Sequence, residues 1–158
     1  EYVNAISTMS WHGVADLLDS SHKLLEALWA LDEEAVAAGI EKAHEEIPIL
    51  QYNDENSLSC TINLALYFAR EYYSIIRELP AGKGFADICM IPRQEHLDKP
   101  AVIIELKWDK NTIGALKQIK EKHYGNALKA YQGKVLLVGI NYNKKSKKHE
   151  CAIEVMEK

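Results

Sequence analysis

The sequence lacks the features of several protein classes. No stretch approaches the roughly 18 consecutive apolar residues of a membrane-spanning helix, and no signal peptide is recognisable. The only cysteines are an odd number without zinc-like spacing, which predicts reduced core residues in a cytoplasmic protein: Cys60, Cys89 and Cys151. Positive charge is not in excess, because the formal net charge is −4. This excludes a bulk nucleic-acid coat, so any nucleic acid must be bound by a local basic patch.

What the chain does contain is enough apolar sequence for one compact domain. It has 158 residues, of which 47% are hydrophobic and 27% charged. Apolar spacing predicts two helices, at residues 11–30 and 32–46, that form a hairpin. Because the chain starts at Glu1, we expect it to be part of a longer protein. We therefore divide it into a helical extension or linker to missing N-terminal sequence, residues 1–50, and a main domain, residues 51–158.

The hydrophobic period changes near the middle of the chain, which indicates a passage from helices to strands. A third helix is expected from about Glu55 to about Tyr72. An antiparallel meander of three strands follows, at residues 73–79, 85–91 and 101–108. A helix capped by Asn111 or Thr112 and two more strands complete the chain, at residues 112–130, 135–141 and 151–155. This order predicts an α/β (α+β) fold with a mixed sheet of about five strands.

Charged side chains interrupt two strands that should be apolar. Glu105 and Lys107 lie two residues apart, so they share one face of the sheet, and Asp87 lies in the preceding strand. Two carboxylates and a backbone carbonyl, here that of Leu106, suit Mg²⁺ or Mn²⁺. A lysine beside the ion would orient or help to deprotonate the attacking water and offset phosphate charge. These residues predict a metal-dependent site that cleaves phosphodiesters.

Other polar residues surround this predicted site in the sequence. Gln118, in the following helix, would position water or substrate, although a solvent-facing helix residue is the alternative. Tyr124 lies about 1.7 turns further on, where it either reaches the site or packs in the core. Lys83 and Gly84 precede Asp87 in a tight turn that allows the backbone to approach a phosphate closely.

Two larger sets of residues are less specific. Basic side chains in the second half form either a rim for a nucleic-acid backbone or a solvated helix face and hairpin tip: Lys117, Lys120, Lys122, Lys129, Lys144, Lys145, Lys147 and Lys148. The histidines have no ligand-like spacing, and none is assigned to a metal: His12, His22, His44, His96, His123 and His149.

Three segments together resemble the PD-(D/E)XK nuclease superfamily: Gly84-Phe-Ala-Asp87, Glu105-Leu-Lys107 and Ala115-Leu-Lys-Gln-Ile-Lys-Glu-Lys-His-Tyr124. More narrowly, they resemble the nuclease-like domain at the C-terminus of bacterial proteins that carry an N-terminal AAA-ATPase-like domain. The similarity covers roughly residues 55–156. It implies a restriction-endonuclease-like core with the order helix, three strands, helix, strand.

The resemblance also implies roles for individual residues. Asp87, Glu105 and Lys107 would form the active-site triad, Gln118 would accompany it, and Glu55 would be an additional acid. One departure from the pattern is Phe85, because relatives usually carry a basic residue two positions before the aspartate. Either Lys83 substitutes for it or that phosphate contact is missing.

Three functional interpretations follow. The first is a Mg²⁺-dependent nuclease acting on nucleic acid, with DNA as the expected substrate and no membrane partner. The second is a catalytically silent nucleic-acid-binding or regulatory module of an ATPase-like protein, because the superfamily includes members that do not cleave. The third is a structural domain that forms a homodimer through its N-terminal helices.

Overall fold

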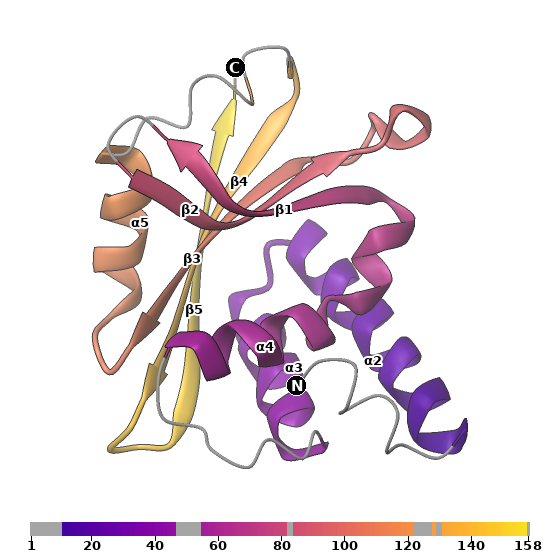
Figure 1. Cartoon of the computed structure of the whole chain (residues 1–158), viewed down its shortest axis with the longest axis vertical. Helices are drawn as coiled ribbons and strands as arrows, with labels where there is room; N and C mark the ends of the chain where they lie inside the picture. The colour runs from indigo at the N-terminus through magenta and orange to yellow at the C-terminus, as the bar shows by residue number, and fades with distance from the viewer. Residues whose placement is uncertain (1–10, 47–54, 82–83, 122–127, 129–130, 158) are drawn as a thin grey trace.

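The computed structural model describes residues 11–46, 55–81, 84–121, 128 and 131–157, which form a mixed sheet between two unequal helical layers (Figure 1). The strands are β1 (Tyr73–Ala81), β2 (Gly84–Pro92), β3 (Ala101–Trp108), β4 (Lys134–Asn143) and β5 (Lys148–Glu157). The α-helices are α2 (Trp11–Trp29), α3 (Glu33–Glu46), α4 (Glu55–Ala65) and α5 (Thr112–Glu121). Two 3₁₀ helices, η1 (Tyr67–Glu71) and η2 (Gln94–His96), lie between them.

The five strands lie in the sheet in the order in which they occur in the sequence. β1, β2 and β3 are antiparallel neighbours, β3 and β4 are parallel, and β4 and β5 are antiparallel. A parallel neighbour requires a crossover, and α5 supplies it between β3 and β4. The expected α/β fold, with a five-stranded mixed sheet and a restriction-endonuclease-like arrangement of its elements, is confirmed.

The two faces of the sheet are covered differently. Helices α2, α3 and α4 cover one face and α5 covers the other (Figure 1). The larger core lies under the three helices, where Leu25, Leu28 and Ile40 pack with Ile62 and Ile104. The smaller core under α5 consists of Cys89, Ala101, Ile103, Leu116, Ile119, Leu128, Val135 and Leu137. Alternate residues of β3 therefore belong to opposite cores, as the two-residue repeat of a strand requires.

The predicted N-terminal helices are present, and Asp32 separates them. Its carboxylate Oδ1 accepts a hydrogen bond from the backbone N–H of Ala35 at 3.0 Å, and its carbonyl accepts the N–H of Val36 at 3.0 Å. These contacts make Asp32 the N-cap of α3. Buried leucines of α2 and Val36 and Ile40 of α3 then join the main core, so the helical pair packs directly on the sheet.

The third helix is shorter than predicted, because α4 ends at Ala65 instead of continuing to Tyr72. Leu66 has φ −99° and ψ 20°, outside the α-helical range, and the chain tightens into η1. The hydroxyl of Ser21, from α2, accepts the N–H of Phe68 at 2.8 Å and fixes this turn. Apolar spacing continues across the junction, so the sequence pattern did not distinguish the two kinds of helix.

Helix α3 covers the outer edge of the sheet at β5. A carboxylate oxygen of Glu33 accepts the N–H of Ile153 at 2.7 Å, and one of Glu41 accepts the N–H of His149 at 3.0 Å. The two glutamates are about 12 Å apart along the helix axis, and the two strand residues are about 14 Å apart. The matching spacings allow one helix to satisfy two backbone donors of an edge strand.

The three cysteines, all within the described residues, form no disulfide, and Cys89 is buried while Cys60 and Cys151 are partly buried. Burial raises the pKa of the Cys89 thiol and of the Cys151 thiol to about 12, so both stay protonated near neutral pH. Within the residues that the structure describes, no helix combines the length and the apolar character needed to cross a membrane.

Candidate active site

The candidate site lies where β2 and β3 separate. The ladder between these strands ends at the pair of Ile88 and Ile104. One step further, the register would place Asp87 opposite Glu105. There the carboxylate Oδ2 of Asp87 accepts the backbone N–H of Leu106 at 2.7 Å. The side chain of Asp87 therefore takes the place of a strand carbonyl and is held at the open end of the ladder.

Glu105 and Lys107 project from β3 toward α5. They alternate with Leu106, whose side chain lies in the opposite core, and share the face of Ile103. Glu105 is only 2% exposed, and the side chain of Lys107 is 12% exposed. Lys107 Nζ lies 3.5 Å from Glu105 Oε1. The lysine charge offsets that of a carboxylate whose burial would otherwise be costly.

Gln118 connects these two charges. Its amide Nε2 donates a hydrogen bond to Glu105 Oε1, and its Oε1 accepts one from Lys107 Nζ. Glu105, Lys107 and Gln118 thus form a closed triangle of side-chain contacts between β3 and α5. A glutamine suits this place because it can donate to a carboxylate and accept from an ammonium group at the same time.

Two features hold α5 close enough to the sheet for Gln118 to contact Glu105 and Lys107. Asn111 Oδ1 accepts the N–H of Gly114 at 2.6 Å. Of the two N-cap residues that the sequence allowed, Asn111 and Thr112, the structure therefore has Asn111. On the sheet, Gly139 of β4 pairs with Glu105 of β3. A Cβ at Gly139 would lie 2.8 Å from the carbonyl oxygen of Thr112 and 2.9 Å from the Cβ of Ala115. Helix α5 can approach β4 this closely only because residue 139 has no side chain.

The loop that follows Lys107 is fixed as well. The buried amide of Asn141 accepts the N–H of Lys110 at 3.0 Å and donates to its carbonyl at 3.2 Å. The same amide donates to Glu150 Oε2 at 2.9 Å. Asp109 adopts the left-handed conformation, with φ 53°, and accepts the N–H of Lys144. The end of β3 is therefore attached to β4 and β5 immediately beyond the candidate site.

The structure brings together four of the residues that the sequence singled out: Asp87, Glu105, Lys107 and Gln118. Glu55 is exposed at the first residue of α4, on the opposite face of the sheet, and its role stays a prediction. Lys83 and Tyr124 lie outside the described residues, and Gly84 is the first residue of β2. Of the expected basic rim, Lys117 pairs with Glu121 at 3.7 Å and Lys120 with Glu154 at 2.5 Å.

The donor set fits a hard divalent cation. Asp87 and Glu105 offer carboxylate oxygens, which Mg²⁺ and Mn²⁺ prefer over nitrogen and sulfur. Hydrogen bonds from Leu106, Gln118 and Lys107 orient these oxygens before any ligand arrives. Asp87 and Glu105 are therefore the residues that could hold such an ion.

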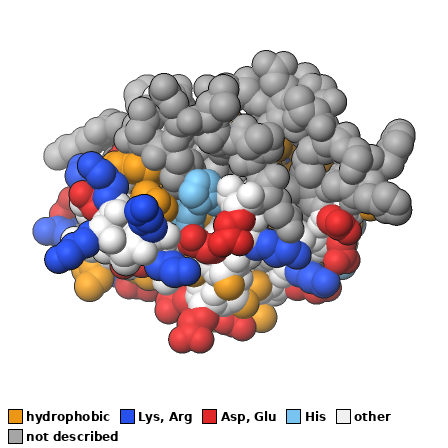
Figure 2. Space-filling model, turned by 90° about the horizontal axis from the view of Figure 1, so that it is seen from below, with side chains coloured by type: hydrophobic (Ala, Val, Ile, Leu, Met, Phe, Trp, Pro, Cys, Tyr) orange, Lys and Arg blue, Asp and Glu red, His pale blue; other side chains and the backbone are white. Residues whose placement is uncertain are grey.

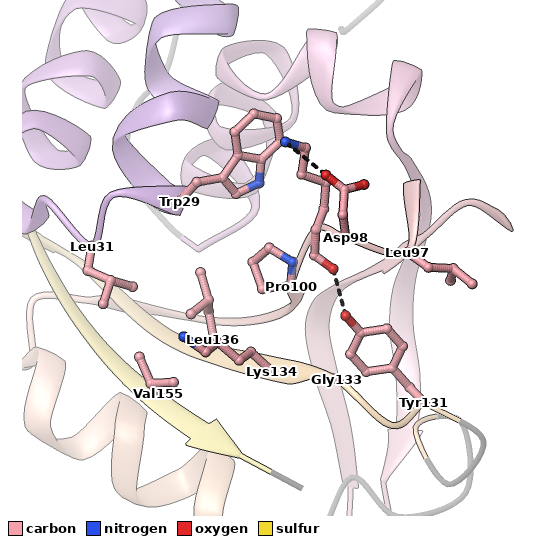
Figure 3. A pocket seen from close by; sticks show the side chains of 11 residues that line it. Trp29, Leu31, Leu97, Asp98, Pro100, Tyr131, Gly133, Lys134, Leu136 and Val155 are labelled. Atoms are coloured by element: carbon pink, nitrogen blue, oxygen red, sulfur yellow. Dashed lines mark hydrogen bonds and ion pairs between the residues drawn. The ribbon is translucent and has the colours of Figure 1, made fainter. Parts of the chain in front are cut away.

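A separate pocket lies at the other end of β3, beside Pro100 (Figure 3). The Tyr131 hydroxyl donates to the carbonyl of Lys99 at 2.6 Å, and the ammonium group of Lys99 lies 4.3 Å from the centre of the Trp29 ring. Leu136 and Val155 contribute apolar walls. This pocket contains none of the residues of the candidate site.

Comparison with known families agrees with this geometry. The family model of the PD-(D/E)XK nuclease superfamily matches residues 54–151, which is more than half of the chain and includes the whole cluster. The chain belongs to the PD-(D/E)XK nuclease superfamily. A search of curated proteins gave no match. Membership suggests nuclease activity, and nucleases of this superfamily generally depend on a divalent metal.

One cluster of this nuclease-superfamily chain was missed from the sequence. Glu41 and His44 of α3 and His149 of β5 each place a ligand atom within 4.8 Å of the other two. His149 Nδ1 lies 2.5 Å from Glu41 Oε2, and burial lowers the pKa of both His149 and His44. Figure 2 shows histidine atoms reaching the surface among acidic and basic side chains. The only signal was Glu41-Lys-Ala-His44, because 104 residues separate His44 from His149.

Proposed function

We propose that this domain hydrolyses phosphodiester bonds of DNA with Mg²⁺ or Mn²⁺ as cofactor. The observation that carries the proposal is the cluster at the open end of the β2–β3 ladder. It contains two oriented carboxylates, a lysine and a glutamine. This set of residue types provides ligands for a hard cation and a positive charge for a phosphate at one place.

Asp87 and Glu105 would hold the ion, with the backbone carbonyl of Leu106 as a third ligand. The direction of β3 supports the carbonyl's role. In an extended strand the N–H and C=O of one residue point to the same neighbouring strand, and the N–H of Leu106 points at Asp87. When bound, the ion supplies phosphate neutralisation and activation of the attacking water.

Lys107 would provide the positive charge on the substrate side. Its side chain is 12% exposed, and its Nζ lies 3.5 Å from the buried Glu105 carboxylate, so Lys107 contacts both that carboxylate and solvent. From there it can donate hydrogen bonds to a phosphate oxygen and to the attacking water. Gln118 would keep Lys107 in position, because it accepts from Nζ while donating to Glu105.

The direct test is metal-dependent cleavage of labelled single- and double-stranded DNA. Wild type, Asp87→Ala and Lys107→Ala are compared with Mg²⁺, with Mn²⁺ and without divalent ions. Asp98→Ala and Lys134→Ala are matched controls, since they remove the same residue types beside the far ends of β3 and β4. We expect wild type and controls to cleave only with an ion, and both site variants to lose about 100-fold or more.

The alternative function is a nucleic-acid-binding or regulatory module without turnover. Binding of DNA by a wild type that shows no cleavage with either ion would favour it and overturn the proposal. Cleavage that persists in both site variants would overturn the catalytic roles of Asp87 and Lys107. Circular dichroism of every variant separates these outcomes from loss of the fold.

The narrower resemblance carries one further proposal about context. An AAA-ATPase-like domain in the same protein would control access of DNA to this domain, which ATP dependence of cleavage by the longer protein would test. As a separate proposal, independent of the resemblance, the chain forms a homodimer through α2 and α3, which would show as doubled mass in light scattering. We also propose that the protein is cytoplasmic, which the lack of a disulfide among its three cysteines supports.

A further inference from the structure

Where α3 contacts β5, three side chains that the proposed nuclease chemistry does not use lie close together. Glu41 and His44 are three residues apart on α3 and therefore project from the same side of the helix. His149, from β5, reaches the same place, and its side chain has no exposed surface. The ligand atoms of all three residues lie within 4.8 Å of one another. A four-coordinate zinc ion holds its ligands about 3.4 Å apart, so small side-chain rotations would close the cluster around an ion.

We propose that Glu41, His44 and His149 form a zinc site that fastens α3 to the edge of the sheet. The donor set is two imidazoles and one carboxylate, which favours Zn²⁺ and its neighbours over Mg²⁺. Three protein ligands leave one position for water. A hollow lined by Glu41, Lys42, Glu45, Lys148 and His149 gives that position a path from solvent.

The surroundings support a built site. The backbone N–H of His149 donates to Glu41 Oε2 at 3.0 Å, so that carboxylate is directed at the cluster before any ion arrives. The Tyr142 ring packs against both imidazoles, with its centre 4.9 Å from that of His149 and 6.1 Å from that of His44. This ring closes one side of the cluster and leaves the hollow as the open side.

The zinc site lies on the opposite face of the sheet from the nuclease cluster, although both are near the same end. His149 pairs with Tyr142 of β4, and Tyr142 stacks on Trp108, which follows Lys107 on β3. An ion here would connect α3 to β5, at the edge of the sheet whose inner strands carry the proposed catalytic residues. Its function would be to stabilise the attachment of α3, with no direct contact with the substrate.

The test measures zinc binding directly and does not depend on cleavage. The tag-free full chain is stripped with a chelator and titrated with Zn²⁺ against a chromogenic chelator. Glu41→Gln and His44→Ala are the main variants, because His44 is only half-buried and its loss leaves the core intact. His22→Ala is the matched control. His22 Nε2 lies 3.7 Å from Glu26 Oε1 on α2, and among the described residues no third metal-ligating side chain joins this pair. Asp87→Ala tests independence from the nuclease cluster.

We expect one Zn²⁺ per wild-type chain, unaffected by excess Mg²⁺. Glu41→Gln and His44→Ala should each weaken binding by more than the roughly 10- to 100-fold that loss of an outer-shell partner costs. His22→Ala and Asp87→Ala should bind as wild type does. A hundredfold excess over Kd should raise the thermal midpoint of wild type by roughly 5 to 10 °C, and that of His44→Ala by much less.

Two results would overturn the proposal. One is zinc binding that Glu41→Gln and His44→Ala leave unchanged. The other is a loss in His22→Ala as large as the loss in His44→Ala, which would indicate scattered surface histidines. With Co²⁺ in place of Zn²⁺, the visible absorption should have the high intensity of four-coordinate cobalt and should disappear in His44→Ala.

Discussion

The two faces of the sheet differ in what they bury. The face under α2, α3 and α4 buries a broad apolar core, with Leu25, Leu28 and Ile104 fully enclosed. The face under α5 has a smaller core, and toward the end of β3 it buries a carboxylate instead, that of Glu105. Because β3 contributes side chains to both faces, residues that stabilise the fold alternate along it with residues suited to chemistry. The comparison predicts that, of two adjacent substitutions in β3, one will mainly reduce cleavage and the other will mainly reduce stability.

The largest expected effect is on cleavage, from Glu105→Gln. The substitution removes the negative charge of a proposed metal ligand, so we expect cleavage to fall by about 1,000-fold, equivalent to about 4 kcal/mol. Stability should change by less than the 3–5 kcal/mol typical of a broken buried pair, because Lys107 retains a route to solvent. Single-turnover cleavage and urea unfolding measure the two quantities. Retained cleavage would contradict the proposed role of Glu105 as a metal ligand.

The next effect is on stability, from Ile104→Ala. Ile104 precedes Glu105 on β3, but its side chain has no exposed surface and packs under the three helices. Removing its methyl and methylene groups should lower the free energy of unfolding by about 2–5 kcal/mol. Urea unfolding measures this loss, and cleavage per folded molecule should stay near the wild-type value. A large loss of cleavage in the folded variant would show that the two faces are not independent.

Substitutions of two glycines, one on each face of the sheet, test the difference between the faces and should have effects of intermediate size. In Gly139→Ala the new methyl group meets the Thr112 carbonyl and Ala115, which should cost about 1–3 kcal/mol. It should also lift Gln118 from Glu105 and reduce cleavage by up to about 100-fold.

Gly39→Ala is the control on the opposite face, where the nearest atom is the flexible end of Leu24 at 2.9 Å. It should leave cleavage unchanged and stability nearly so, because alanine also favours the helix. The two variants are compared by single-turnover cleavage and thermal unfolding. Equal effects on cleavage would contradict the role of close packing under α5.

The smallest effect concerns the edge contact of α3. Glu33→Ala removes the acceptor for the N–H of Ile153, and we expect a loss of about 1 kcal/mol because the glutamate is exposed. Glu34→Ala, the exposed next residue of the same helix, should change stability by less than about 0.5 kcal/mol. Urea midpoints of the two variants measure the difference, and indistinguishable values would mean that water replaces the carboxylate without cost.

Much of the fold could be predicted because its signals are local. The alternation in β3 placed Glu105 and Lys107 on one face, and the order of periodic segments gave the mixed sheet. The cap at Asn111 was one of two residues that the sequence allowed. The end of α4 at Ala65 was missed, because apolar spacing is similar in α- and 3₁₀-helical turns.

The site was predicted as a set of residues but not as an arrangement. Nothing local indicates that Asp87 accepts the N–H of Leu106, since the contact depends on where two strands separate. The requirement for glycine at position 139 depends on how closely α5 packs on β4. The Glu41, His44 and His149 cluster depends on docking a helix against a strand more than a hundred residues away. Contacts of this kind are set by tertiary packing, which periodicity does not encode.

The carboxylates of Glu33 and Glu41 also affect whether a strand from another molecule can pair with the sheet at β5. Each occupies a backbone N–H of β5 that a strand from another molecule would need for pairing. An incoming strand at β5 would have to displace both before its ladder could form. Edge-to-edge pairing with a strand of another molecule is therefore less favourable at β5 than it would be without these two carboxylates.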